Sequence, residues 1–372
     1  MNEALLHKSP RIHAHNRELQ GITEVFSPRE LMRDEAAKYR RLTPRTQDVY
    51  ERKDQLALRI SVVFNIAITV VKVFAVVASG SLAVMATLVD SALDVLSQFI
   101  LFYTDSAAKQ QHSSRFPAGR TRLAPLGIFI CAVIMGMASI EVIHESVLKL
   151  IELFWADGAK DMGVSMNALV AAAMAFSFVS KLVLYIYCTR VSRITNNDSV
   201  KAVALDHLND VLSVFGATAA AGASFYSQNL LWVDPVSAIA ISVYIMNEWW
   251  ETAQEQANML VGRAANDQFL TEVRKVGDVH HAELKVDIIR AYHFGPKYLV
   301  ELEVVLPSSM TLEMTHDIGM ELQHKIEAFD EVERAFVHID YQERDYDEHN
   351  EKSWPPHYAE RVRETIRKST DV

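Results

Sequence analysis

Six long apolar stretches in the middle of the sequence limit most strongly how this chain can fold. Each approaches the roughly 20 residues that a helix needs to cross the hydrocarbon core of a bilayer. The sequence therefore predicts a polytopic α-helical membrane protein with six transmembrane helices. The predicted spans are residues 56–78, 81–103, 123–147, 166–188, 200–226 and 231–250.

Charged residues are concentrated at the two ends of the chain. The mean hydropathy of +0.05 would suit a soluble protein, but it averages an apolar middle with two polar ends. The formal net charge of −10 argues against a nucleic-acid-binding protein, which would normally present a basic surface. The N-terminal residues lack the apolar core of a secretory signal, so we expect the first span to direct membrane insertion.

Basic residues are distributed unevenly among the predicted loops. The loops on one side of the membrane contain only Lys149 and Lys160, whereas the loops on the other side and the segment before the first span contain many. Because cytoplasmic loops carry an excess of Lys and Arg, the rich side is predicted to be cytosolic. With an even number of spans, both termini then lie in the cytosol. These basic residues include Arg40, Arg41, Arg45, Arg52, Lys53, Lys109, Arg115, Arg120, Arg122, Arg190, Arg193 and Lys201.

The sequence after the last span predicts a small cytosolic α+β domain. A helical pattern from Asp267 leads into two alternating stretches that are joined by Gly295-Pro296. A second amphipathic helix and a third strand, VERAFVHID, complete an αββαβ order with the helices on one face of the sheet. The predicted organisation is a cytosolic N-terminal segment at 1–55, a transmembrane domain at 56–262, this domain at 263–343, and an acidic, polar tail at 344–372. We expect the acidic stretch RDYDEHNEKSW of this tail to be disordered.

Two membrane spans each contain an Asp-x-x-x-Asp pattern. Asp90 and Asp94 lie in the second span, and Asp206 and Asp210 lie in the fifth. A separation of four residues is about one helical turn, so both carboxylates of each pair lie on the same side of their helix. A carboxylate inside a bilayer is costly unless it is paired, hydrated or bound to a cation. No Lys or Arg is nearby in either span, and the pattern therefore favours a cation-binding site.

The ligands in this site would all be oxygen atoms, which suit Mg²⁺, Ca²⁺ or Mn²⁺ better than softer metals. An alternative is that the four aspartates face a hydrated cleft or pair with distant basic residues. The presence of two such motifs in one chain favours the metal site.

Five segments of the chain resemble the cation diffusion facilitator family. They are GSLAVMATLVDSALDVLSQFILFYT, RFPAGRTRLAPLGI, DHLNDVLS, WVDPVSAIAISVYIMNEWWETA and ELQHKIEAFDEVERAFVHIDY. The resemblance covers nearly everything from Leu56 to Tyr341 and is closest to the manganese-type subgroup, the metal-tolerance proteins. It implies a metallochaperone-like C-terminal domain and a homodimeric metal/proton antiporter rather than an enzyme. It also favours an endomembrane, such as that of the Golgi or a vacuole, over the plasma membrane.

The resemblance also bears on the choice of metal. Zinc-type members carry His-x-x-x-Asp in the fifth span, and here Asp206 stands in the His position. His207 is rotated by about 100° around the helix and does not restore the zinc pattern. Mn²⁺ is therefore favoured, with Zn²⁺ and Fe²⁺ as alternatives. Asn65 matches a position that is often Asn in manganese-type members, where its amide oxygen either joins the metal site or makes an interhelical hydrogen bond.

Three residues of the C-terminal domain fall where some relatives bind metal at the dimer interface. These are His316, His338 and Asp340, but other ligands of that site are replaced by Val286 and Glu301. The resemblance thus implies a partial or absent regulatory site.

The predicted mechanism is alternating access, in which Mn²⁺ enters from the cytosol and protons replace it when it leaves on the other side. Two other function classes remain open. A membrane metalloenzyme is disfavoured because the chain has neither Glu-x-x-His nor His-Glu-x-x-His. A non-transporting, metal-sensing subunit is disfavoured because all four aspartates are retained.

Overall fold

The computed structural model describes residues 44–79, 82–110, 114–155, 168–226, 230–347, 349 and 351–370. Most of the predicted N-terminal segment, residues 1–43, lies outside the described residues. The described chain divides into two compact units. One holds residues 42–263 with 292–298, and the other holds residues 264–291 with 299–372.

Six long helices form the first unit, and each coincides with one predicted span. They are α3 (Pro44–Ser79), α4 (Leu82–Ala108), α5 (Leu123–Trp155), α6 (Ala168–Thr195), α7 (Asp198–Tyr226) and α8 (Val233–Val261). Among the described residues, 47–74 and 123–155 meet a strict criterion of length and apolar composition for crossing a membrane. The predicted six-helix transmembrane fold is confirmed.

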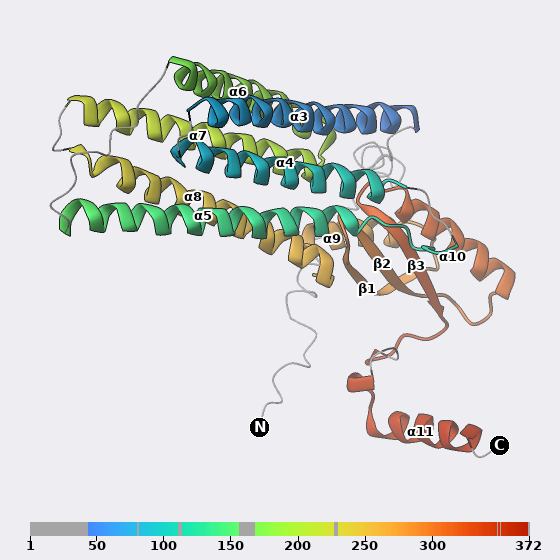
Figure 1. Cartoon of the computed structure of the whole chain (residues 1–372). Helices are drawn as coiled ribbons and strands as arrows, with labels where there is room; N and C mark the ends of the chain where they lie inside the picture. The colour runs from blue at the N-terminus through green and yellow to red at the C-terminus, as the bar shows by residue number, and fades with distance from the viewer. Residues whose placement is uncertain are drawn as a thin grey trace, which may run out of the picture. The chain divides into compact units, whose positions relative to one another are not determined.

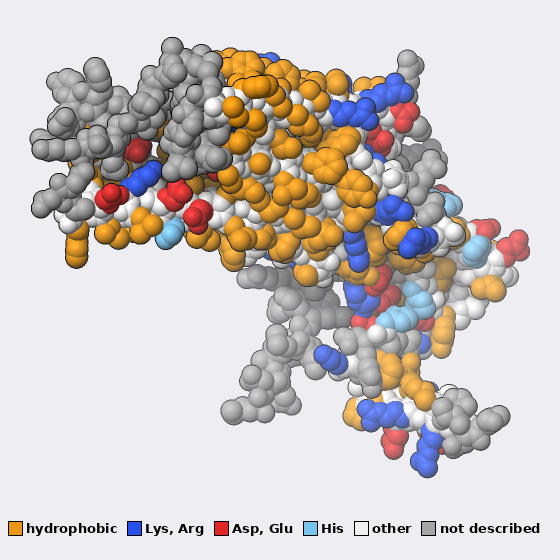
Figure 2. Space-filling view, in the orientation of Figure 1, with side chains coloured by type: hydrophobic (Ala, Val, Ile, Leu, Met, Phe, Trp, Pro, Cys, Tyr) orange, Lys and Arg blue, Asp and Glu red, His pale blue; other side chains and the backbone are white. Residues whose placement is uncertain are grey.

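The helices pack side by side, with α5 along α8, α6 along α7 and α3 along α4 (Figure 1). Leu58, Leu101, Ile128, Cys188 and Val203 are fully or almost fully buried where several helices meet. Hydrophobic side chains also cover much of the visible outer face of the bundle (Figure 2). An exposed apolar surface of this extent is typical of a surface that contacts lipid.

Close packing of α4 against α5 requires a glycine at position 127. A Cβ atom there would lie 2.0 Å from Oγ1 and 2.7 Å from Cβ of Thr104, whereas a Cβ at Gly136 on the same helix would meet no atom within 4 Å. Gly127→Ala should therefore destabilise the protein by about 1–3 kcal/mol through overpacking. Gly136→Ala is the matched control and should be neutral or slightly stabilising, because Ala favours helix by about 1 kcal/mol. Thermal unfolding of the full chain in detergent checks this, and equal melting temperatures for the two variants would contradict it.

The second unit, together with the hairpin tip at residues 292–298 that clusters with the first, has the predicted αββαβ order. Its elements are α9 (Asp267–Asp278), β1 (Lys285–Phe294), β2 (Lys297–Val305), α10 (Leu312–Glu327) and β3 (Val332–Asp340). The strands form one sheet in the order β1-β2-β3. Gly295, with a φ of 75°, begins the turn between β1 and β2, a left-handed conformation that glycine adopts without strain.

Local signals account for these elements. Asn266 caps α9 by accepting a hydrogen bond from the N–H of Phe269, and Thr311 caps α10 in the same way. In β2 the buried side chains are Val300, Leu302 and Val304, which alternate with less buried neighbours. This period of two is the pattern of a strand with one face in a core. The predicted α+β domain is confirmed.

The tail contains a helix beyond the acidic stretch that was predicted to be disordered. Residues 356–370 form a helix, α11 (Pro356–Thr370), which begins with a proline at the first helical position. Glu364 and Lys368 make an i,i+4 ion pair of 2.7 Å, and the Tyr358 ring packs against Trp354 with a centroid distance of 5.2 Å.

Candidate metal site

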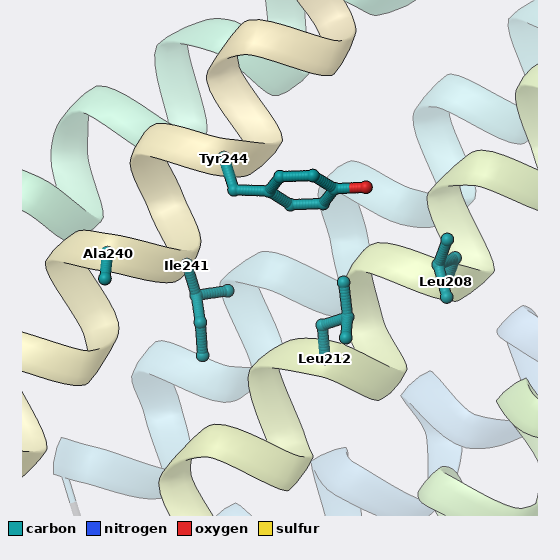
Figure 3. Close-up of a pocket in the computed structure, with 5 residues that line it drawn as sticks. All are labelled: Leu208, Leu212, Ala240, Ile241 and Tyr244. Carbon is teal, nitrogen blue, oxygen red and sulfur yellow. The ribbon is translucent and has the colours of Figure 1, made fainter.

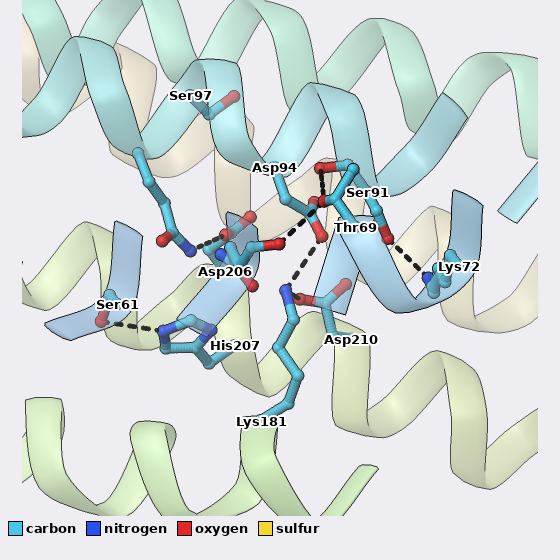
Figure 4. Close-up of polar contacts among 12 residues, drawn as sticks. Ser61, Thr69, Lys72, Ser91, Asp94, Ser97, Lys181, Asp206, His207 and Asp210 are labelled. Carbon is cyan, nitrogen blue, oxygen red and sulfur yellow. Dashed lines mark hydrogen bonds and ion pairs between the residues drawn. The ribbon is translucent and has the colours of Figure 1, made fainter. Parts of the chain in front are cut away.

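Two helices bring three of the four predicted aspartates together inside the bundle. Asp94 comes from the middle of α4, and Asp206 and Asp210 come from α7, where they lie one turn apart (Figure 4). Asp94 is 6% exposed and Asp206 is 1% exposed. Asp94 and Asp210 are close enough to Asp206 to interact with it electrostatically. A cluster of buried carboxylates is strongly unfavourable without positive charge nearby.

Part of that positive charge comes from Lys181 on α6. Its Nζ lies 2.9 Å from Oδ2 of Asp94 and also forms an ion pair with Oδ2 of Asp210 (Figure 4). Pairing with distant basic residues was the alternative considered from the sequence, but this lysine in the fourth span was not identified as the partner. The available signal was a lysine inside a predicted membrane span, since such a charge normally needs a partner there.

Asp206 makes a different set of contacts. Its Oδ2 accepts a hydrogen bond of 3.0 Å from Nε2 of Gln98 on α4. Its Oδ1 is buried and has no hydrogen-bond partner among the described residues. Buried carboxylate oxygens are nearly always paired, so this oxygen is a candidate ligand for a cation.

His207 lies closer to the carboxylates than its helical position suggested. One ligand atom from each of Asp206, His207 and Asp210 can be chosen so that all lie within 4.8 Å of one another, which makes them a group that could hold a metal ion. The Nε2 of His207 is 3.1 Å from Oγ of Ser61, and Nδ1 is buried without a partner among the described residues. With the ring proton on Nε2, Nδ1 offers a lone pair to a metal. Sequence reasoning had set this residue aside.

The remaining predicted site residues lie at different depths. Asn65 on α3 is 2% exposed, and its Nδ2 has no hydrogen-bond partner in the described part of the chain. Asp90 lies on α4 one turn from Asp94 and is exposed. The structure therefore brings Asp94, Asp206 and Asp210 into one cluster and leaves Asp90 at its edge.

The three candidates in the C-terminal domain are placed differently. His316 is exposed on α10, and the exposed His338 on β3 packs its ring against His349 with a centroid distance of 4.5 Å. Asp340 forms an ion pair with Arg344 and accepts the N–H of Tyr341 at 2.7 Å. Within the described residues, the side chains that are grouped closely enough for one metal ion are in the bundle and do not include these three.

A second buried polar cluster ties the helix ends together. Oδ2 of Asp54 on α3 and Oδ1 of Asp105 on α4 each accept a hydrogen bond of 3.0 Å from Nδ2 of Asn197, which lies between α6 and α7. Lys109 pairs with both carboxylates, at 3.4 Å for Asp54 and 2.8 Å for Asp105. These contacts join α3, α4 and the α6–α7 loop at the end of the bundle that carries the basic loops.

The bundle also has an apolar pocket away from the carboxylates. It opens between α7 and α8, and Figure 3 shows its lining of Leu208, Leu212, Ala240, Ile241 and Tyr244. No carboxylate lines it, so the aspartate cluster remains the candidate site.

The chain is similar to known proteins over most of its length. Residues 58–261 match the family model of the cation efflux transmembrane domain, and residues 265–342 match that of the cation efflux protein cytoplasmic domain. The chain is 39% identical to metal tolerance protein 5 of Oryza sativa subsp. japonica, over 78% of this chain and 68% of the relative. It is 36% identical to metal tolerance protein 11 of Arabidopsis thaliana, over 82% of this chain and 75% of the relative.

The transmembrane part and the part that follows it match the two cation efflux models, and the bundle holds buried carboxylates. The chain therefore belongs to the cation efflux (cation diffusion facilitator) family of integral membrane proteins, which export divalent metal cations, and its C-terminal domain is cytoplasmic.

Proposed function

We propose that this protein exports Mn²⁺ from the cytosol in exchange for protons by alternating access. The observation that carries the proposal is the meeting of Asp94, Asp206 and Asp210 inside the bundle. Their oxygen atoms suit a hard divalent cation. The four predicted ligands would then be these three aspartates together with Asp90, and Asn65 is a possible fifth.

The choice of Mn²⁺ rests on Asp206, which stands where zinc-type members have His. Mn²⁺ accepts oxygen ligands readily, whereas Zn²⁺ prefers sites with nitrogen or sulfur ligands. His207 argues in the other direction, since it can offer a nitrogen beside Asp206 and Asp210. Zn²⁺ and Fe²⁺ are therefore the alternatives that the test must include.

Charge crowding supports exchange with protons. Carboxylates close together in a site of low dielectric repel one another, and either a metal ion or protons can relieve that repulsion. The two kinds of cation compete for the same oxygen lone pairs. Binding of metal from the cytosol and of protons from the other side is then sufficient for antiport.

Alternating access also requires an end of the bundle that can open and close. The contacts of Asp54 and Asp105 with Lys109 and Asn197 join three parts of the bundle at its cytosolic end. We propose that these polar contacts close the cytosolic path and that they separate when metal enters. Polar contacts suit this role because water can replace each of them when the helices part.

Metal uptake into proteoliposomes that contain the pure protein tests this function. The panel should include Mn²⁺, Zn²⁺, Fe²⁺ and Ca²⁺ under a proton gradient, with protein-free vesicles as the control. We expect Mn²⁺ uptake to be fastest and to dissipate the gradient. Binding of metal without uptake would favour a metal-sensing subunit. Uptake of Zn²⁺ or Fe²⁺ faster than that of Mn²⁺ would identify that metal as the substrate instead.

The cytosolic domain is proposed to hold two copies of the chain together, as its match to the family's cytoplasmic domain suggests. Deleting residues 267–372 should weaken dimerisation more than membrane insertion, because the six spans carry their own topology signals. Size-exclusion chromatography with light scattering in mild detergent at low concentration measures this. A truncated chain that stays fully dimeric would contradict the prediction.

We also propose an endomembrane location, which the resemblance to metal-tolerance proteins favours, and a cytosolic position of both termini, which the basic loops predict. Fluorescent tags at each end, with selective permeabilisation of the plasma membrane, test both parts of this proposal. Tags that are protected from added protease would overturn the orientation.

A further inference from the structure

We propose that the Lys181 ammonium is a tethered cation that competes with the transported metal for Asp94 and Asp210. In this arrangement metal binds only by displacing the ammonium, and the returning ammonium helps to release the metal. The inference deepens the proposed function and rests on it.

The Nζ atom of Lys181 occupies the space between the aspartate motifs of α4 and α7. It lies 2.9 Å from Oδ2 of Asp94 and pairs with Oδ2 of Asp210, so a single positive atom joins the aspartate motifs of α4 and α7 (Figure 4). A divalent metal that bound both motifs would lie roughly 2–2.6 Å from carboxylate oxygens of the same two side chains. Two cations cannot occupy that space together, so binding of the metal requires Nζ to move.

The buried Lys181 ammonium does not neutralise all the negative charge of the carboxylate cluster. Lys181 is 3% exposed, which means that its partners rather than water neutralise it. Asp90, Asp94, Asp206 and Asp210 outnumber the ammonium groups of Lys181 and of Lys72, which also interacts electrostatically with these carboxylates. The cluster therefore keeps an excess of negative charge that attracts a divalent cation. Removing the ammonium would increase that excess and should strengthen metal binding.

The lysine side chain makes the displacement feasible. Its charge sits on a flexible stem of four carbon atoms, so Nζ can leave the carboxylates without a shift of α6. A metal ion has no such tether. The ammonium therefore stays close to the site after displacement and can return when the metal leaves, whatever the metal concentration.

A lysine with a purely structural role predicts the opposite result. If Lys181 only joined α4 to α7, its removal would loosen the cluster and weaken metal binding. The direction of the change in affinity therefore distinguishes the two roles.

The test uses the full-length protein with Lys181→Met, Lys181→Arg and Lys149→Met. Lys149 is exposed on α5 and serves as the matched control. Calorimetric titration with Mn²⁺ in detergent should show binding at least about tenfold tighter in Lys181→Met, close to wild type in Lys181→Arg, and unchanged in Lys149→Met. In proteoliposomes, Lys181→Met should reach half-maximal rate at a lower Mn²⁺ concentration and have a lower maximal rate, because release becomes slower.

If Lys181→Met folds poorly, thermal unfolding with and without Mn²⁺ tests the inference instead. If the ammonium substitutes for a metal ion, Mn²⁺ should stabilise Lys181→Met more than it stabilises the wild type. A variant that stays unfolded at saturating Mn²⁺, or one that folds and binds Mn²⁺ no more tightly than wild type, overturns the inference. Wild-type protein that transports no metal of the panel refutes the proposed function as well, whereas active wild type with unchanged affinity in Lys181→Met refutes only this inference.

Discussion

Asp210→Asn should reduce metal transport by about 100-fold or more while the protein still inserts and forms dimers. The carboxylate lies in the cluster with Asp206 and pairs with Lys181. Loss of a group that only supports a metal ligand typically costs about 10–100-fold in metal affinity or activity, and loss of a ligand should cost at least as much. Asn keeps the shape of the side chain, and Asp94 remains as a partner for Lys181, so the fold should persist.

Initial rates of Mn²⁺ uptake into proteoliposomes measure this effect. Glu152→Gln, which removes an exposed charge on α5, is the control and should transport normally. Asp90→Asn should lose less activity than Asp210→Asn, because Asp90 is exposed at the edge of the cluster. A near-normal Mn²⁺ flux in Asp210→Asn would contradict the assignment of the metal site to the aspartate cluster.

The second large effect concerns the choice of metal. Asp206→His would recreate the His-x-x-x-Asp arrangement of zinc-type members while keeping Asp90, Asp94 and Asp210. Imidazole is a preferred ligand of Zn²⁺, and one nitrogen with three oxygens can complete a tetrahedral shell. Mn²⁺ would lose an oxygen ligand. We expect the ratio of Zn²⁺ flux to Mn²⁺ flux to rise about tenfold, which corresponds to about 1.4 kcal/mol of relative stabilisation of the transition state.

Flux under a proton gradient is the quantity to measure, since Zn²⁺ binds many sites tightly without being transported. His207→Gln is the companion variant because it removes the nitrogen that already lies near Asp206 and Asp210. Its flux ratio should fall if that nitrogen contributes to the binding of Zn²⁺. An unchanged ratio in an active Asp206→His variant would move the determinant of selectivity to another residue, with Asn65 the first to test.

The sequence by itself determined the features that depend on short-range patterns. The length of the apolar runs predicted six spans, alternation and turn residues predicted the αββαβ domain, and the spacing of Asp90, Asp94, Asp206 and Asp210 predicted that each pair shares a helix face. These signals are local, because hydrogen bonding within a helix and the period of a strand act over a few residues.

Only the tertiary structure decided which side chains meet. Lys181 is 29 positions from Asp210 along the chain and 87 from Asp94, yet it pairs with both. His207 lies near the carboxylates although its place on the helix had suggested otherwise, and Asp90 lies at the edge although it is one turn from Asp94. Such contacts depend on which helices are neighbours and on the rotation of each helix about its axis. Packing of whole helix surfaces sets both, and no single segment of sequence carries that information.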